Sequence, residues 1–342
     1  MGGGFLMGSS YFYMEFLFAW VSSLKQAGFR NPALFALEYT LVPDAIYPTQ
    51  LVQTVAGYEH VLSITQDPSR VCVGGDSAGG TLILSLLLYL ANSPGYEIQR
   101  PGLAILVSPW VTLVSPKNHN TRSDYLNAES LHLYARQYAG SSASLNDPLV
   151  SPGMCKDLSW WSRAVPSAGI VFYYGSEEVF CQEIRDLAAL LEQTGRVIQA
   201  REEEGLIHAW PVATLFLSDS KAERQKGIKE IVQVTWGCMN RNFGSKERSL
   251  DAVLRFNVQS GISVAGALLL AKSLRELAVA IEALDRNAQI NGKKQLENQL
   301  ASAQWGIPKT FPTTTIFNVN VRPELFLFTL SMRIHMALSE IP

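Results

Sequence analysis

A short apolar run, a glycine-rich turn with one serine at its apex and a long apolar helix follow one another between Arg70 and Leu90. The turn reads Gly75-Asp76-Ser77-Ala78-Gly79, with Gly80 behind it, and fits the pattern G-x-S-x-G. A serine on a sharp strand-to-helix turn needs neighbours without a Cβ, because the strand and the helix approach closely there. The pattern predicts a nucleophile elbow that presents the hydroxyl of Ser77. The alternative is a glycine-rich turn whose serine only caps the helix.

A serine hydroxyl is a weak nucleophile, so a base must take its proton and a third group must hold that base. Among the five histidines, His208 is the candidate base, because it follows a strand-like run, Arg196 to Ala200, and heads an apolar helix. A histidine after the last strand of an open α/β sheet lies at the carboxyl ends of the strands, where Ser77 also lies. The other histidines lie in a helix-like stretch, a polar loop, an amphipathic helix and an apolar tail segment, and are His60, His119, His132 and His335.

The acid of such a set is expected between the serine and the histidine in chain order. Residues Ala168 to Tyr174 form an apolar strand pattern that runs directly into Glu177 and Glu178. Adjacent residues that leave a strand point in different directions, so we expect only one of these carboxylates to face His208. The residues alone leave the choice between the two glutamates open.

Taken in order, these motifs resemble the hormone-sensitive-lipase-like branch of the α/β-hydrolases, over roughly residues 2–236. GGGF at Gly2 to Phe5 resembles the end of the family's oxyanion loop, and GDSAGG matches its elbow. Three further segments resemble family patterns, and they are LEYTLVPDAIYPTQL, NDPLVSP and GLIHAWP. By this resemblance the acid falls on Glu178, where the family more often carries an aspartate.

The resemblance implies a mostly parallel sheet with helices on both faces and a carboxylic ester hydrolase that acts on short-to-medium acyl chains. Ser77 would attack the ester carbonyl, with His208 as the base and Glu178 as the acid. The oxyanion would be held by three backbone N–H groups, those of Gly2, Gly3 and Ala78. The expected partner is a small-molecule ester, and we expect neither a cofactor nor a metal ion.

The beginning of the chain departs from the family pattern. The family's glycine loop follows three strands and a histidine, whereas this chain has Met1 at the position of that histidine. We therefore expect an N-terminally truncated relative that lacks the first strands, has an unpaired sheet edge and carries Gly2 and Gly3 at a free terminus. This departure motivates a second hypothesis, a catalytically impaired relative that acts as a binding or scaffold protein.

Charge and hydropathy exclude some partners. The formal net charge is −2 over 342 residues and no basic block occurs, which argues against nucleic acid and anionic membranes. The sequence contains no run of 18 apolar residues, so we predict no membrane span. The N-terminus lacks the basic region of a signal peptide, so we predict a cytoplasmic location. The four cysteines are scattered without metal-ligand spacing, and Cys72 is predicted to be a buried thiol.

A hydrophobic content of 47% is enough for one large core and an additional piece. We predict a hydrolase domain over residues 1–236, followed over residues 237–342 by a linker and a mainly helical extension of unknown role. Self-association is expected through the sheet edge or this extension. In the extension we expect helix at 250–284, extended chain at 308–322 and an apolar helix at 323–341. In the hydrolase domain we expect strands at 32–38, 71–73, 101–107, 168–174 and 196–200, and helices at 10–24, 49–64, 82–90, 128–138 and 221–236.

Overall fold

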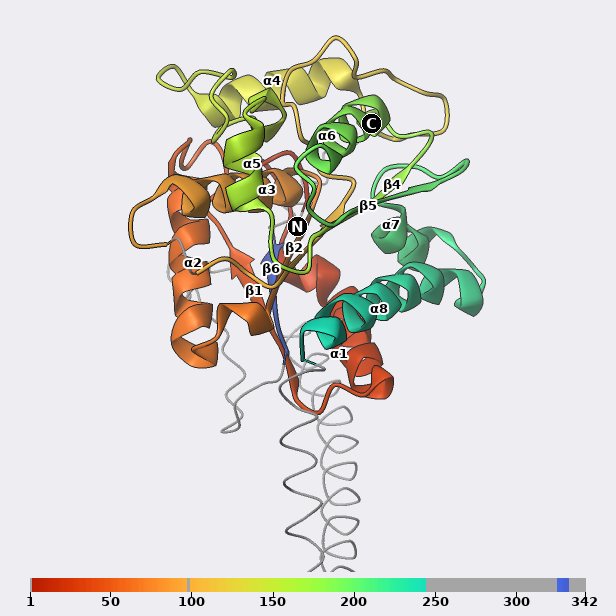
Figure 1. Ribbon diagram of the computed structural model, residues 1–342. Helices are drawn as coiled ribbons and strands as arrows, with labels where there is room; N and C mark the ends of the chain where they lie inside the picture. Colours follow the sequence, from red (N-terminus) through yellow and green to blue (C-terminus); the bar gives the residue numbers. More distant parts are fainter. Residues whose placement is uncertain (1, 97–98, 244–324, 332–342) are drawn as a thin grey trace, which may run out of the picture. The chain divides into compact units, whose positions relative to one another are not determined.

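The computed structural model describes residues 2–96, 99–243 and 325–331 (Figure 1). These residues form one six-stranded sheet with the strand order β1-β6-β2-β3-β4-β5, in which all neighbours are parallel. The strands are β1 Pro32–Glu38, β2 Val71–Asp76, β3 Leu103–Val107, β4 Ile170–Gly175, β5 Ile198–Glu203 and β6 Leu325–Ser331. Since parallel strands all end on the same edge of a sheet, the loops that follow β2, β3, β4 and β5 meet at that edge.

Helices cover both faces of the sheet. In Figure 1, α1 and α8 lie on one face, and α2, α3, α5 and α6 lie on the other. Parallel sheets are covered on both faces, and their strands are correspondingly apolar, as in the fully buried LAILV run of β3. The helices are α1 Met14–Ala27, α2 Thr49–Thr65, α3 Ala78–Asn92, α4 Ala128–Ala139, α5 Leu158–Ala164, α6 Cys181–Glu192, α7 Trp210–Leu217 and α8 Lys221–Phe243, with 3-10 turns at Ser10–Tyr13, Pro68–Arg70 and Pro152–Met154.

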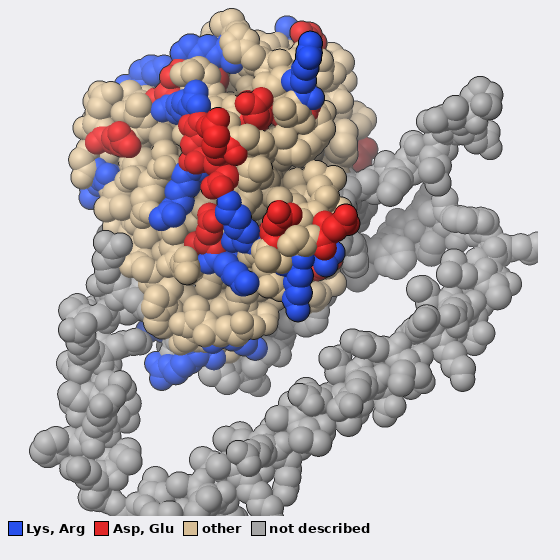
Figure 2. Space-filling model, turned by 90° about the vertical axis from the view of Figure 1, so that its right-hand side faces the viewer, with Lys and Arg blue, Asp and Glu red and all other residues tan. Residues whose placement is uncertain are grey.

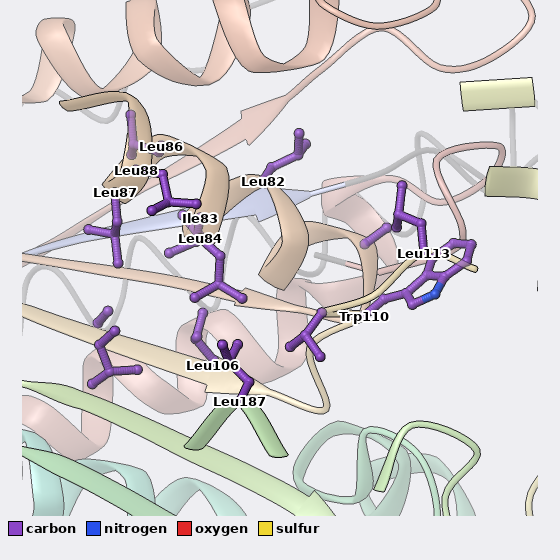
Figure 3. Packing of buried hydrophobic residues seen from close by; sticks show 14 of the residues in the cluster. Leu82, Ile83, Leu84, Leu86, Leu87, Leu88, Leu106, Trp110, Leu113 and Leu187 are labelled. Carbon is purple, nitrogen blue, oxygen red and sulfur yellow. The ribbon is translucent and has the colours of Figure 1, made fainter. Parts of the chain in front are cut away.

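The helix behind the elbow is the centre of the core. Helix α3 is apolar all round, which is the pattern of a helix that is buried on every side. Its leucines pack against Leu106 of β3, Trp110 and Leu113 of the following loop, and Leu187 of α6 (Figure 3). Helix α3 also packs between α2 and α5. The turn that carries Ser77 is thus attached to the best-buried helix of this part of the chain.

The elements expected for residues 1–236 are present, with ends that differ by a few residues, whereas helix α5 was not expected. The strand expected at 71–73 continues to Asp76, and the helix expected at 10–24 begins as a 3-10 turn and ends at Ala27. Helix α1 ends there because Gly28 takes a left-handed φ of 109°. The α/β class with helices on both faces is confirmed.

Two expectations for the C-terminal part are wrong. Of the apolar helix expected at 323–341, the structure describes residues 325–331, and these form strand β6, Leu325–Ser331, which pairs with β1 on one side and β2 on the other. An apolar run without a clear period fits a buried strand and a buried helix equally well. The linker expected after residue 236 is helix α8 as far as Phe243, because Cys238 and Met239 continue its buried side.

The expectations for 250–284 and 308–322 lie outside the described residues. The domain division at residue 236 and self-association remain predictions.

On the face that Figure 2 shows, Lys and Arg are interspersed with Asp and Glu. Ion pairs join the two signs, among them Arg185 with Glu202 and Lys226 with Glu203. Within the described ranges, no helix is both long enough and apolar enough to span a membrane.

Candidate active site

Ser77 lies in the turn between β2 and α3 with φ 50° and ψ −122°, a backbone conformation that non-glycine residues rarely adopt. A Cβ at Gly75 would lie 2.5 Å from the carbonyl of Gly79, and a Cβ at Gly80 would lie 2.6 Å from the Cβ of Pro109. The glycines are therefore required by close approach, as the motif predicted. The side chain of Ser77 makes no capping hydrogen bond to α3, so the alternative of a simple cap is wrong.

The elbow is tied to the segment that follows β3. The N–H of Ser77 donates to the carbonyl of Val107 (3.0 Å), and the carbonyl of Ser77 accepts from the N–H of Trp110 (3.0 Å). Between these two residues, Ser108 has a positive φ of 44°, and its N–H donates to the carbonyl of Tyr173 on β4 (2.6 Å). The ends of β2, β3 and β4 are thus joined within a few residues of Ser77.

Glu178 and His208 are both buried at this edge, each with 3% of its surface exposed. Oε1 of Glu178 lies 3.8 Å from Nδ1 of His208. Neither atom has a hydrogen-bond partner among the described residues. Catalytic hydrogen bonds are often long in a ligand-free site and shorten when the substrate binds.

The second carboxylate oxygen of Glu178 is fully engaged. Oε2 accepts from Oγ of Ser108 (2.5 Å) and from the N–H of Gly175 (2.9 Å). Oγ of Ser108 also accepts from the N–H of Ala209 (2.8 Å), the residue after the histidine. One hydroxyl therefore connects the loop that carries the acid with the loop that carries the histidine.

Of the two glutamates, Glu178 is buried with Oε1 3.8 Å from Nδ1 of His208, whereas Glu177 is half-buried. The structure also separates the other histidines from the site. His60 contacts the ring of Phe35, and His119 is exposed. Nε2 of His132 lies 3.4 Å from the N–H of Ser115, and His335 is outside the described residues.

Two of the three predicted oxyanion donors, Gly2 and Ala78, lie next to the serine. A Cβ at Gly2 would lie 2.6 Å from the Cβ of Ser77 and 2.7 Å from Oδ2 of Asp76, so the backbone of Gly2 packs directly against the elbow. Ala78 is the first residue of α3, where N–H groups have no partner inside the helix. Gly3, with φ 122°, uses its carbonyl to accept the N–H groups of Leu6 and Met7.

Two anchors hold the glycine loop and the elbow. The ring of Phe5 stacks on Tyr138 with centroids 3.8 Å apart. Under the elbow, the hydroxyl of Tyr13 donates to Oδ2 of buried Asp76 (3.0 Å). Burial raises the pKa of Tyr13 well above its usual value and the charge of Asp76 raises it further, so this phenol keeps its proton.

Sequence reasoning missed four polar groups around the site, namely Tyr13, Ser108, Thr121 and Asp124. Only Ser108 carries a usable signal, because it directly follows a buried strand. In the part of the chain that is described, no group of three His, Cys, Asp or Glu side chains is arranged to hold a metal ion. Cys72 is a buried free thiol, as predicted, and burial raises its pKa.

Comparison with known proteins adds independent information. Residues 2–212 match the model of a family described by the α/β-hydrolase fold. A Schizosaccharomyces pombe protein, provisionally named a steryl acetyl hydrolase, is 29% identical over 237 residues, which cover 66% of this chain and 58% of the relative. An acetyl-hydrolase of Streptomyces hygroscopicus is 28% identical over 213 residues, which cover 61% of this chain and 66% of the relative.

The chain thus spans less than two thirds of the length of these curated relatives. Hormone-sensitive lipases of mammals also match, over about a third of this chain. Among solved structures, an esterase/lipase from an uncultured bacterium superposes with a TM-score of 0.55 at 23% identity, over 71% of this chain and 75% of that one. At this level of identity the structural match supports the fold.

Proposed function

The chain belongs to the α/β-hydrolase-fold family, as its motifs predicted, and we propose that it is a serine hydrolase that cleaves carboxylic esters of short-to-medium acyl chains. The observation that carries the proposal is the buried pair of Glu178 and His208, at the same edge of the sheet as the strained Ser77. The names of the two relatives that span most of this chain make acetyl esters the first substrates to test.

In the proposed reaction, Oγ of Ser77 attacks the ester carbonyl while Nε2 of His208 takes the hydroxyl proton. The carboxylate of Glu178 stabilises the resulting imidazolium through Nδ1, across the 3.8 Å that separates the two groups. The tetrahedral oxyanion accepts hydrogen bonds from the N–H groups of Gly2, Gly3 and Ala78, where one donor contributes roughly 3 kcal/mol.

Collapse of this intermediate breaks the ester bond, and the imidazolium gives its proton to the departing alcohol. A water molecule then attacks the acyl group on Ser77, again with His208 as the base, and releases the carboxylic acid. All proton transfers use one imidazole. The reaction as proposed draws on side chains and backbone N–H groups of this chain.

The test compares the wild type with Ser77→Ala in labelling by a fluorophosphonate probe and in hydrolysis of p-nitrophenyl esters from acetate to octanoate. We expect Ser77→Ala to abolish labelling and to reduce turnover by about 10⁴-fold or more. Ser85→Ala is the matched control, because Ser85 is a buried serine of the same helix that bonds only to a helix carbonyl. A folded wild type that labels no better than Ser77→Ala would contradict the proposal and favour a binding or scaffold protein.

A second pair of variants tests which of the two glutamates is the acid. We expect Glu178→Gln to reduce kcat by roughly 10⁴-fold, because the amide can no longer stabilise the imidazolium. Glu177→Gln changes the neighbouring, half-buried carboxylate and is expected to keep kcat within about twofold, since such a surface change disturbs little. The opposite order of effects would assign the acid to Glu177.

A further inference from the structure

A polar segment before helix α4, residues Thr121–Tyr125, reaches the loop that carries the proposed acid. Oγ1 of Thr121 donates to the carbonyl of Glu177 (2.6 Å), and Oδ2 of Asp124 accepts from the N–H of Val179 (2.9 Å). These two bonds hold the backbone immediately before and immediately after Glu178. We call residues 121–125 the bridging segment.

The same segment also holds the histidine. Oδ1 of Asp124 accepts from the N–H of His208 (3.2 Å), and the hydroxyl of Tyr125 donates to the carbonyl of His208 (3.3 Å). One carboxylate therefore bonds with one oxygen to the acid loop and with the other oxygen to the histidine loop. Hydrogen bonds to an ionised group are stronger than those between neutral groups, and Asp124 is buried, which strengthens them further.

The bridging segment is itself fixed in shape. The N–H of Asp124 donates to Oγ1 of Thr121 (3.1 Å), so the two side chains that reach across are coupled in one turn. The N–H of Tyr125 donates to Oδ1 of Asp124 (3.0 Å), which orients the carboxylate. The turn therefore holds the two loops at a fixed separation.

The bridging segment bears on the distance between Glu178 and His208. Their facing atoms are 3.8 Å apart, so a shift of less than 1 Å in either loop decides whether a hydrogen bond forms. The two residues follow different strands, β4 and β5, and their relative position depends on bonds that cross between the loops. We propose that Thr121 and Asp124 are positioning residues that set the distance between the acid and the histidine. This inference rests on the proposed function.

The experiment measures kcat and KM for p-nitrophenyl acetate, together with the amplitude and rate of fluorophosphonate labelling, in the full chain. Asp124→Asn keeps the shape but turns one of the two acceptor oxygens into a donor. Because a misplacement of about 1 Å can cost about 100-fold in rate, we expect kcat to fall roughly 10- to 100-fold, while KM stays within about twofold and labelling still reaches full amplitude at a lower rate.

Thr121 provides a rescue test. Thr121→Val removes the hydroxyl at nearly constant shape and is expected to lower kcat in the same way, whereas Thr121→Ser retains the hydroxyl and is expected to stay within about twofold of the wild type. Asp157→Asn is the matched control. Asp157 is an exposed aspartate that accepts two backbone N–H groups at the start of α5, and we expect no change in kcat.

Two results would overturn the inference while leaving the proposed function in place. One is a wild type with Ser77-dependent turnover and a kcat that stays within twofold in both Asp124→Asn and Thr121→Val. The other is a labelling amplitude that falls in proportion to kcat, since this shows loss of folded protein. A wild type without Ser77-dependent turnover contradicts the proposed function, and the inference falls with it.

Discussion

Replacing Ser108 by alanine removes a buried hydroxyl that connects the acid loop with the histidine loop. Oγ of Ser108 donates to Oε2 of Glu178 at 2.5 Å and accepts from the N–H of Ala209 at 2.8 Å, and all three groups are buried. Alanine, like serine, carries a Cβ and must take the positive φ of 44° found here, so the backbone strain is the same in both proteins. The loss therefore reports on the two hydrogen bonds.

The expected magnitude follows from these contacts. A hydrogen bond to an ionised group contributes about 1.5–3 kcal/mol, and a buried N–H left without a partner costs about 1–3 kcal/mol. Oε2 of Glu178 keeps the bond from the N–H of Gly175, which places the total near the lower part of the combined range, at about 3 kcal/mol. With a urea dependence of about 3 kcal/mol per molar, the unfolding midpoint is expected to fall by about 1 M.

Urea unfolding of the full chain, followed by tryptophan fluorescence, measures this shift. Ser85→Ala serves again as the control, because it removes a buried hydroxyl that bonds only to the carbonyl of Thr81 in α3 (3.0 Å). The higher helix propensity of alanine offsets that loss by about 0.5 kcal/mol, so we expect a shift below about 0.3 M. Equal midpoints for Ser108→Ala and Ser85→Ala would refute the reasoning.

Two further predictions concern the elbow and the buried phenols. Gly75→Ala would place its Cβ 2.5 Å from the carbonyl of Gly79 and is expected to destabilise the fold by about 3 kcal/mol or more. In helix α8, the Cβ of Gly237→Ala would meet no atom of the described residues within 4 Å, so this variant is expected to stabilise the fold by about 0.5–1 kcal/mol. Equal urea midpoints for the two variants would contradict this prediction. Burial raises the pKa of several tyrosines, among them Tyr13, Tyr39, Tyr58 and Tyr138. Stability should therefore be complete below about pH 10, where the unfolded chain also keeps these protons, and should fall as the pH rises further. Absorbance at 295 nm should show these tyrosines ionising only as the protein unfolds, and their ionisation near pH 10 in the folded protein would contradict the prediction.

The placement of Ser77, Glu178 and His208 at one edge of the sheet could be predicted because each lies within five residues of the end of a strand, and parallel strands bring their ends together. The same rule would have found Ser108, which follows β3. It could not find Thr121 and Asp124, because they lie in a loop and their partners include backbone N–H and carbonyl groups, which every residue carries. A single sequence contains no signal for such a pairing.

Strand β6 shows a different limit. Its run LFLFTLS is apolar without a period that separates strand from helix, and its neighbours in the sheet, β1 and β2, lie some 250 residues or more earlier in the chain. For such a run the local pattern leaves the type of element open. It also does not describe where in the sheet a fully apolar strand is inserted, because that depends on which edges are free to pair.

The site combines one rigidly held group with two groups on loops. A strained serine persists only where its surroundings determine its conformation. Here these are the bonds to Val107 and Trp110 and the buried helix α3. Glu178 and His208 are held instead by hydrogen bonds that cross between loops. These come from the backbone, as from the N–H of Glu177 to the carbonyl of Leu206 (3.0 Å), and from side chains such as Asp124. Variation in the geometry of the site therefore arises between the acid and the histidine, where 3.8 Å separates the facing atoms. Hence polar substitutions around those loops should alter rate more than substrate binding.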